Sequence, residues 1–286
     1  MRSGFVAVAG RPNVGKSTLV NALCGDKVAI TSRVPNTTRR RILGVANGPD
    51  WQLVLADLPG FQRPMDPLTT KMQKTVDASF DDVDAVLLVV SARDRIGAGD
   101  RYVGRRVFSL GVPVIIAVNK IDRLKHAHVA TQMKAAATLG DFHALHPVSA
   151  VTKDGVGELR DDLASLLPEG PAYFPDGQST DLTTANRIAE VVREKALHLT
   201  RDEVPHAITV EIDEIGDKLV RAFVLVETES QKGILVGKKG AMVREIGSRA
   251  RPEVEHLLGH PVFLELVVKV RPKWRRDTKM LESLGL

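Results

Sequence analysis

The sequence predicts two domains, an α/β domain with a doubly wound, mostly parallel sheet and a smaller α+β domain after it. Three observations support this prediction. Short apolar runs alternate with helical patterns in the first part, a stretch rich in proline and glycine follows, and a different order of elements begins after it. The 286 residues also exceed the usual length of one domain. We expect domains at 1–170 and 184–286, joined by a linker at 171–183.

The first part alternates between buried strands and helices. The strand candidates are short apolar runs, at 4–9, 53–56, 85–90, 114–118 and 146–148. The helical patterns are at 16–23, 66–80, 100–110, 127–139 and 157–167. Such alternation is typical of parallel strands connected by helices that cover both faces of one sheet.

The last part has a different pattern. Residues 168–182 contain three prolines and two glycines without an apolar period, which is typical of a linker. After them we expect elements in the order α-β-β-α-α-β, at 184–199, 206–215, 218–226, 230–235, 241–257 and 262–270. The alternation of apolar and polar residues in 206–215 predicts a half-buried strand. These elements form a compact α+β unit.

Composition narrows the class of protein. Hydrophobic residues make up 43% and charged residues 26%, as in ordinary globular chains. The longest apolar runs are far shorter than the roughly 18 residues of a membrane-spanning helix. The single cysteine, Cys24, cannot form an internal disulfide, which fits a reducing cytosol. The net charge of +5 is modest, but basic residues cluster in 231–251 and 269–279, which indicates either a polyanion-binding face or ordinary solvated charge.

A glycine-rich motif lies between the first strand and the first helix. It comprises Gly10, Arg11, Pro12, Asn13, Val14, Gly15, Lys16 and Ser17, and Thr18 follows it. Its spacing is that of a phosphate-binding loop, whose backbone N–H groups converge on phosphate oxygens at a helix N-terminus. We expect Lys16 to contact the β and γ oxygens and the Ser17 hydroxyl to ligate Mg²⁺.

Three further motifs follow later strands. They are Asp57-Leu58-Pro59-Gly60, then Asn119-Lys120-Ile121-Asp122, and finally Ser149-Ala150. Asp57 can hold Mg²⁺ through water, and the Gly60 amide can sense a γ-phosphate. Asp122 can accept two hydrogen bonds that guanine offers and adenine does not, which selects GTP over ATP. Strand ends of a parallel sheet meet at one crevice, so we expect one GTP site.

These motifs resemble those of translation-factor-class GTPases with GRPNVGKS and TTR signatures. The resemblance implies that Thr38, or alternatively Thr37, ligates Mg²⁺ and contacts the γ-phosphate. Phe61 stands where Ras-like enzymes have a glutamine, and phenylalanine cannot orient water. The resemblance also implies that Asn13 helps to hold K⁺. The expected catalytic residues are Lys16, Asn13, Thr38 and Gly60, and Phe61 is counted with the GTP-binding residues.

The last domain contains a GxxG loop between its two short helical patterns. This loop and the order of elements resemble a type II KH domain, in which the loop clamps about four single-stranded nucleotides. The expected RNA-binding residues are Gly237, Lys238, Lys239, Gly240, Arg244, Lys273 and Trp274. Trp274 could stack on a base, or it could be a packing anchor at the end of the domain.

Taken over its whole length, the chain resembles the Era family of bacterial ribosome-assembly GTPases. The resemblance implies slow GTP hydrolysis, binding near the 3′ end of 16S rRNA, and a role in assembly of the 30S subunit. It also implies a monomer in the cytoplasm with peripheral association with the inner membrane. Two alternatives are a nucleotide-gated scaffold whose turnover is incidental, and an RNA-binding regulator whose phosphate loop is only structural.

Overall fold

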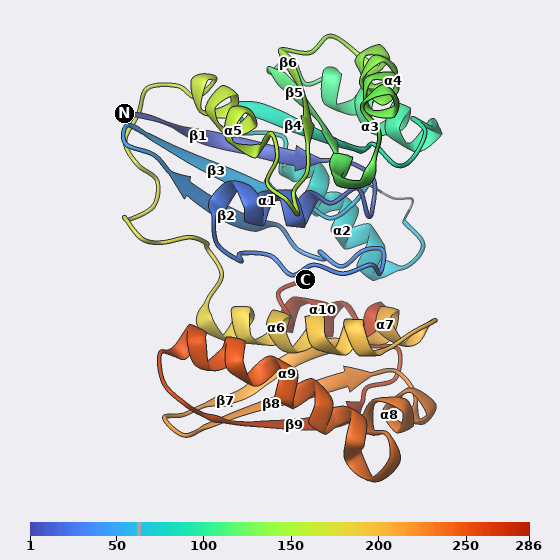
Figure 1. The fold of residues 1–286 in the computed structure, drawn as a ribbon. Helices are drawn as coiled ribbons and strands as arrows, with labels where there is room; N and C mark the ends of the chain where they lie inside the picture. Colours follow the sequence, from blue (N-terminus) through green and yellow to red (C-terminus); the bar gives the residue numbers. More distant parts are fainter. Residues whose placement is uncertain (62–63) are drawn as a thin grey trace. The chain divides into compact units, whose positions relative to one another are not determined.

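The computed structural model describes residues 1–61 and 64–286. By its internal contacts the chain divides into two compact units. The first unit comprises Met1–Ala29, Pro35–Pro64 and Thr69–Asp181, and the second comprises Ile30–Val34, Met65–Leu68 and Leu182–Leu286 (Figure 1). Two short segments of the first half of the sequence thus belong to the second unit.

The first unit is built on a six-stranded sheet in the order β2-β3-β1-β4-β5-β6. Its strands are β1 (Arg2–Ala9), β2 (Ile42–Asn47), β3 (Trp51–Asp57), β4 (Ala85–Ser91), β5 (Val114–Asn119) and β6 (Ala144–Val148). All neighbours are parallel except β2, which is antiparallel to β3. The predicted doubly wound, mostly parallel sheet is confirmed. Because β1 lies between β3 and β4, the strand order reverses there. Open α/β sheets bind ligands in a crevice at the carboxyl ends of the strands at such a point.

Strand β2 was missing from the prediction. Its sequence ILGVAN has no strict alternation, and Gly44 interrupts its apolar residues. A side chain at Gly44 would come within 2.8 Å of the Cys24 Sγ atom on the first helix. The glycine therefore serves packing against a distant segment, and local sequence does not reveal that constraint.

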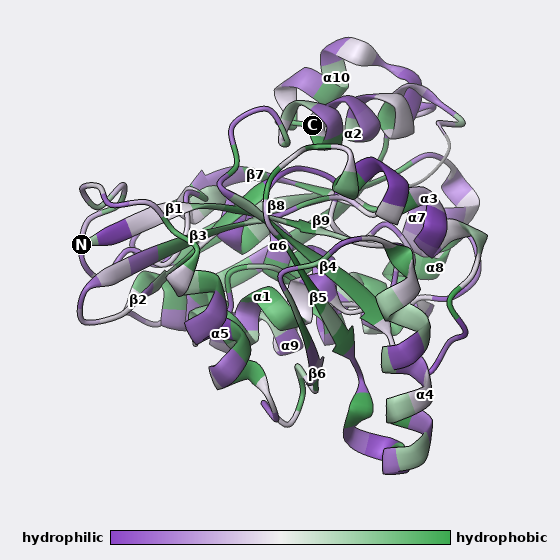
Figure 2. Cartoon of the chain, turned by 90° about the horizontal axis from the view of Figure 1, so that it is seen from above, coloured by the Kyte–Doolittle hydropathy of each residue, from purple (hydrophilic) through white to green (hydrophobic). Residues whose placement is uncertain are grey.

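Helices cover both faces of this sheet. They are α1 (Lys16–Cys24), α2 (Pro67–Ala78), α3 (Ala98–Phe108), α4 (His126–Ala136) and α5 (Val156–Ser165). Leucines of α1 and α5 pack in one buried cluster, while valines of α3 pack in another together with Phe80 after α2. The strands β4 and β5 are almost wholly hydrophobic (Figure 2), as expected for strands buried on both faces.

The predicted linker has no helix and only an isolated bridge partner of Gly44 at Thr180. It is nevertheless fixed to the first unit. The side-chain carbonyl of the buried Gln52 accepts hydrogen bonds from the backbone N–H groups of Tyr173 and Phe174, at 2.7 and 2.9 Å. The Val45 N–H donates to the Ser179 carbonyl. Most of this segment therefore packs along the first unit.

The second unit contains a three-stranded sheet in the order β7-β8-β9. Its elements are α6 (Thr184–Leu199), α7 (Val204–Ala207), β7 (Thr209–Ile215), β8 (Leu219–Val226), α8 (Glu229–Val236), α9 (Ala241–Leu258), β9 (Phe263–Val270) and α10 (Thr278–Ser283). Strand β7 is antiparallel to β8, and β9 is parallel to β8. The predicted α-β-β-α-α-β order is confirmed, with the short helices α7 and α10 in addition. Buried residues of α6, α8, α9 and the sheet form one core.

Candidate nucleotide and RNA sites

The phosphate loop lies between β1 and α1, at the point where the strand order reverses. Gly10, Asn13 and Gly15 have positive φ angles of 152°, 63° and 98°. A Cβ atom at Gly15 would lie 2.4 Å from the Asn119 side-chain nitrogen, and one at Gly10 would lie 2.5 Å from the Val89 carbonyl. Both glycines are thus required by backbone conformation and by close approach of other strands.

Lys16 is buried beneath this loop. Its ammonium group donates to the carbonyl oxygens of Gly10 and Arg11, each at 3.1 Å. Burial lowers the pKa of Lys16 to about 8, and the nearby Asp57 carboxylate opposes that shift in part. A phosphate group at the loop would favour the charged form and raise this pKa. The loop thus holds a desolvated cation at the position where the sequence predicts a contact with β and γ oxygens.

Three oxygen-bearing side chains converge next to Lys16. The Ser17 hydroxyl lies 2.7 Å from Asp57 Oδ2 and 2.9 Å from the Thr38 hydroxyl, which in turn lies 3.2 Å from Asp57 Oδ2. Asp57 is fully buried, and its Oδ1 atom accepts no hydrogen bond from the described residues. Burial raises the pKa of Asp57, although the hydroxyls and Lys16 oppose this. Hard oxygen ligands with an unsatisfied carboxylate oxygen fit Mg²⁺.

The segment after β3 packs tightly against the phosphate loop. A Cβ atom at Gly60 would lie 2.8–3.0 Å from atoms of Pro12, so only glycine fits this approach. The next residue, Phe61, is buried and stacks on Phe80 with ring centroids 5.8 Å apart. Its side chain belongs to the hydrophobic core. It therefore provides no polar group for an attacking water, as the sequence indicates.

Asn119 connects three loops of the crevice. Its amide nitrogen donates to the Val14 carbonyl at 3.0 Å, and its Oδ1 atom accepts from the backbone N–H groups of Lys120 and Ala150. The Lys120 ammonium group donates to the Asn13 carbonyl. These contacts join the phosphate loop to the ends of β5 and β6.

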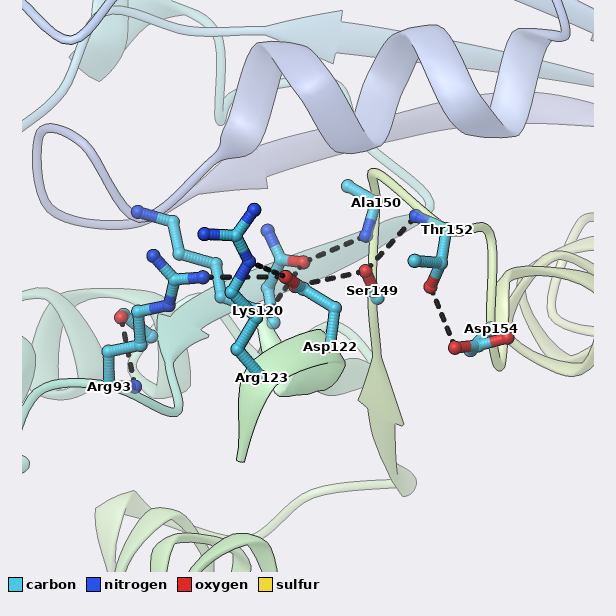
Figure 3. Close-up of polar contacts among 10 residues, drawn as sticks. Arg93, Lys120, Asp122, Arg123, Ser149, Ala150, Thr152 and Asp154 are labelled. Atoms are coloured by element: carbon cyan, nitrogen blue, oxygen red, sulfur yellow. Dashed lines mark hydrogen bonds and ion pairs between the residues drawn. The ribbon is translucent and has the colours of Figure 1, made fainter. Parts of the chain in front are cut away.

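The Asp122 carboxylate lies between Arg93 and Ser149 in this network (Figure 3). Its Oδ1 atom accepts from the Ser149 hydroxyl at 3.1 Å, and its Oδ2 atom lies 3.4 Å from the Arg93 guanidinium. Ser149 is fully buried, whereas the Asp122 side chain keeps 12% exposure. A positioned carboxylate at an accessible edge is what recognition of guanine requires.

In the second unit, the GxxG loop connects α8 to α9. Gly237, Lys239 and Gly240 have φ angles of 69°, 51° and 78°. A side chain at Gly237 would come within 2.8 Å of Met242 Cβ. Both loop lysines are exposed, and the exposed Arg244 lies beside Gly240. The loop thus presents backbone and cations together, as a phosphate-contacting loop requires.

A groove lies between α9, the helix that follows this loop, and β9. It has a volume of about 340 Å³ and is lined by Val243, Arg244, Gly247, Ser248 and Arg251 from α9 and by the start of β9. Its walls combine apolar side chains with two arginines and the carboxylate of Glu265. Such a mixed surface accommodates bases beside phosphates.

Comparisons with known proteins identify the family of this chain. A family model described as 50S ribosome-binding GTPase matches residues 5–120, and a KH domain model matches residues 203–275. GTPase Era of Heliobacterium modesticaldum (strain ATCC 51547 / Ice1) is 41% identical over 290 residues, which cover 100% of this chain and 97% of that protein. The chain belongs to the Era family of GTPases. GTPase Era of Mycobacterium tuberculosis (strain ATCC 25177 / H37Ra) is 45% identical over 294 residues, with 99% and 98% coverage.

Solved Era structures match the whole chain. Era in complex with MgGDPNP and nucleotides 1506–1542 of 16S ribosomal RNA has a TM-score of 0.96 at 39% identity, covering 100% of this chain and 99% of that one. A variant of Aquifex aeolicus Era bound to GDP·AlF4⁻ has a TM-score of 0.95 at 38% identity, with the same coverage. This chain is thus an Era-family GTPase in which a KH domain follows the P-loop domain.

One predicted RNA contact of this Era-family chain requires correction. Trp274 is only 1% exposed, and its indole N–H donates to the Ala207 carbonyl at 2.8 Å. It therefore anchors the packing of the second unit, which was the alternative interpretation, and its ring is not accessible to a base. Its neighbour Lys273 is exposed.

Two polar residues near the nucleotide site were missed. Arg93 pairs with Asp122, and the buried Asp100 accepts a hydrogen bond from Arg11 Nε at 2.7 Å. Both lie in or next to the segment between β4 and α3, which carries no GTPase motif. Sequence spacing gave no signal for them, because Arg93 is 29 residues from its partner and Asp100 is 89 residues from its partner.

Proposed function

We propose that this GTPase binds 16S rRNA near its 3′ end through its KH domain and acts in maturation of the 30S subunit. The observation that carries the proposal is the GxxG loop, where Gly237 and Gly240, both with positive φ angles, flank the exposed Lys238 and Lys239. The close similarity to an Era chain in complex with nucleotides 1506–1542 supports this choice of RNA.

In the proposed reaction, water attacks the γ-phosphorus of GTP, the bond to the β–γ bridging oxygen breaks, and GDP and phosphate leave. Lys16 stabilises charge on the β and γ oxygens from beneath the loop. Ser17, Thr38 and Asp57 would hold Mg²⁺, which neutralises phosphate charge when bound. Asp122 and Asn119 orient the base and the loops around it.

Thr38 and Gly60 are the proposed sensors of the γ-phosphate. The Thr38 hydroxyl already lies with the magnesium-binding group, and Gly60 is pressed against Pro12 of the phosphate loop. Loss of the γ-phosphate removes a ligand from both segments. We propose that this change sets the affinity for RNA.

We propose further that Asn13 helps to hold a K⁺ ion that assists hydrolysis. The buried Phe61 supports this proposal, since its ring is packed in the core and no water-orienting side chain occupies that position. Asn13, within the phosphate loop, has a left-handed backbone conformation with a φ of 63°.

Crosslinking in cells with GTP-locked protein, followed by sequencing of the bound RNA, tests the RNA partner. We expect reads concentrated at the 3′ end of 16S rRNA, and a Lys238→Asp/Lys239→Asp variant should lose them. Reads spread over unrelated RNAs would contradict the proposal. Single-turnover hydrolysis by the isolated protein distinguishes a GTPase from the scaffold alternative, in which turnover is incidental and release from the RNA depends on a partner. Detectable hydrolysis without any partner would support the GTPase.

No described helix is long and apolar enough to cross a membrane. A cytoplasmic location, peripheral association with the inner membrane and a monomeric state follow from the family resemblance and stay predictions. Fractionation of cells with light scattering of the purified protein would test all three.

A further inference from the structure

A hollow of about 520 Å³ lies on the α2–α3 side of the phosphate loop. It is lined by Arg11, Pro12, Phe61, Gln73, Tyr102 and Arg105, together with residues at the start of α3. All of these belong to the first unit. The hollow shares Arg11, Pro12 and Phe61 with the nucleotide motifs, but its other walls hold no predicted GTP ligand. Its volume is that of a site for a small ligand group.

Tyr102 presents an aromatic ring at this hollow. The residue is 50% exposed, and its ring packs edge-on against the buried Phe61 at a centroid distance of 6.5 Å. The contact positions the ring while half of the residue remains in solvent. An exposed ring held in this way can accept a stacked base with little loss of side-chain entropy.

Two cations flank this tyrosine on α3. Arg101 and Arg105 are exposed, and neither guanidinium has an ion pair or hydrogen bond with any residue in 1–61 or 64–286. Two nearby arginines do form ion pairs: Arg106 pairs with Asp77, and Arg11 pairs with Asp100. Arg105 lines the hollow, whereas Arg101 lies one helical turn before it on α3 and outside the lining residues. The hollow therefore combines an exposed ring with an unpaired guanidinium, as single-strand nucleic-acid sites do.

We propose that this hollow is a second RNA contact, where one base of a single strand stacks on Tyr102 and adjacent phosphates pair with Arg101 and Arg105. The inference rests on the proposed RNA-binding function but concerns the first unit. Phe61 forms one wall and directly follows Gly60, the proposed γ-phosphate sensor. Binding at the hollow should therefore be tighter with a GTP analogue than with GDP.

The test uses the full chain with a non-hydrolysable GTP analogue and a single-stranded RNA of about 40 nucleotides from the 16S 3′ end. Tyr102→Ala and Arg105→Glu should each weaken binding of this RNA about tenfold, the loss expected for one stacked base or one phosphate pair. Binding of a 12-nucleotide fragment that fills only the KH loop should not change. With 4-thiouridine in the long RNA, crosslinks should map to the peptide containing Tyr102.

The chain offers matched controls. Tyr102→Phe keeps the ring and should retain wild-type affinity, which guards against a folding defect. Tyr173, the other of the two tyrosines, is 52% exposed in the same unit, so Tyr173→Ala should bind normally. Lys134→Glu reverses an exposed charge on α4 and should have little effect.

The outcomes separate this inference from the proposed function. Wild-type affinity of both hollow variants for the long RNA, with a loss in Lys238→Asp/Lys239→Asp, would overturn the second contact and leave the KH assignment standing. Wild-type affinity in all of these variants would overturn RNA binding as proposed. If the hollow variants bind naked RNA normally but lose isolated small ribosomal subunits, the surface contacts a protein, and the RNA inference is wrong.

Discussion

The nucleotide crevice and the GxxG loop both bring cations to expected phosphates, but they do so in opposite environments. In the crevice, Lys16, Thr38 and Asp57 are buried and hydrogen-bonded to the groups around them. In the loop, Lys238 and Lys239 are exposed to solvent in a turn that begins and ends with glycine. A desolvated, preorganised charge interacts strongly with one small ligand, whereas solvated charges contribute additively along an extended one. The two regions should therefore respond differently to mutation, salt and pH.

The largest effect is expected for Lys16→Ala, which removes the buried cation. We expect GTP hydrolysis to fall at least about a hundredfold, since one preorganised group at developing charge is worth this much in other enzymes. Single-turnover rates at saturating GTP measure it, with Lys134→Ala as the exposed-lysine control. A loss below tenfold would show that burial of Lys16 gives it no special role.

A somewhat smaller effect is expected at the base. Asp122→Asn should weaken GTP binding about a hundredfold and favour XTP, because the amide offers a donor where guanine also offers one. Competition between GTP and XTP measures the preference, and Asp141→Asn on an exposed loop is the control. Unchanged preference for GTP would remove Asp122 from the base site.

The loop should respond less per residue. Lys238→Asp with Lys239→Asp should weaken binding of a single-stranded 3′-end rRNA oligonucleotide at least tenfold and flatten the salt dependence by about 0.7 in log–log slope for each lost contact. Titrations at two salt concentrations measure both. The control pair is Lys218→Asp with Arg201→Asp, also exposed in the second unit and outside both basic clusters. GTP binding serves as the check on folding.

The crevice should also depend on pH. The pKa of Lys16 is lowered to about 8 in the free protein, and a bound phosphate raises it. The affinity for the nucleotide should therefore be highest below pH 8, where Lys16 is protonated. It should fall as pH rises through 8, by about tenfold at pH 9. GDP binding measured in EDTA would show this without a metal contribution. Lys16→Arg should remove the dependence, because a guanidinium stays protonated.

The smallest effect concerns the monovalent ion. Replacing K⁺ by Na⁺ at equal ionic strength should slow hydrolysis several-fold if Asn13 helps to place K⁺ beside the phosphates. Asn13→Ala should reduce the difference between the two salts. Equal wild-type rates in both salts would contradict the potassium proposal and leave the rest of the crevice unaffected.

Local sequence was sufficient where a structure depends on neighbours in the chain. Helix α6 begins and ends at the predicted residues, Thr184 and Leu199. It was predictable because apolar residues recur at helical spacing along its whole length. The phosphate loop was predictable because its glycines, lysine and serine act at fixed spacing between a strand and a helix.

Tertiary structure decided whatever depends on residues distant in sequence. The burial of Trp274 against Ala207, the pairing of Arg93 with Asp122 and the attachment of Tyr173 and Phe174 to Gln52 each join separate segments. Strand β2 forms because β3 provides its hydrogen bonds and α1 packs against its glycine. Sequence periodicity predicts which residues are buried. Only the packed fold determines which residue each of them contacts, because many buried positions are compatible with the same periodicity.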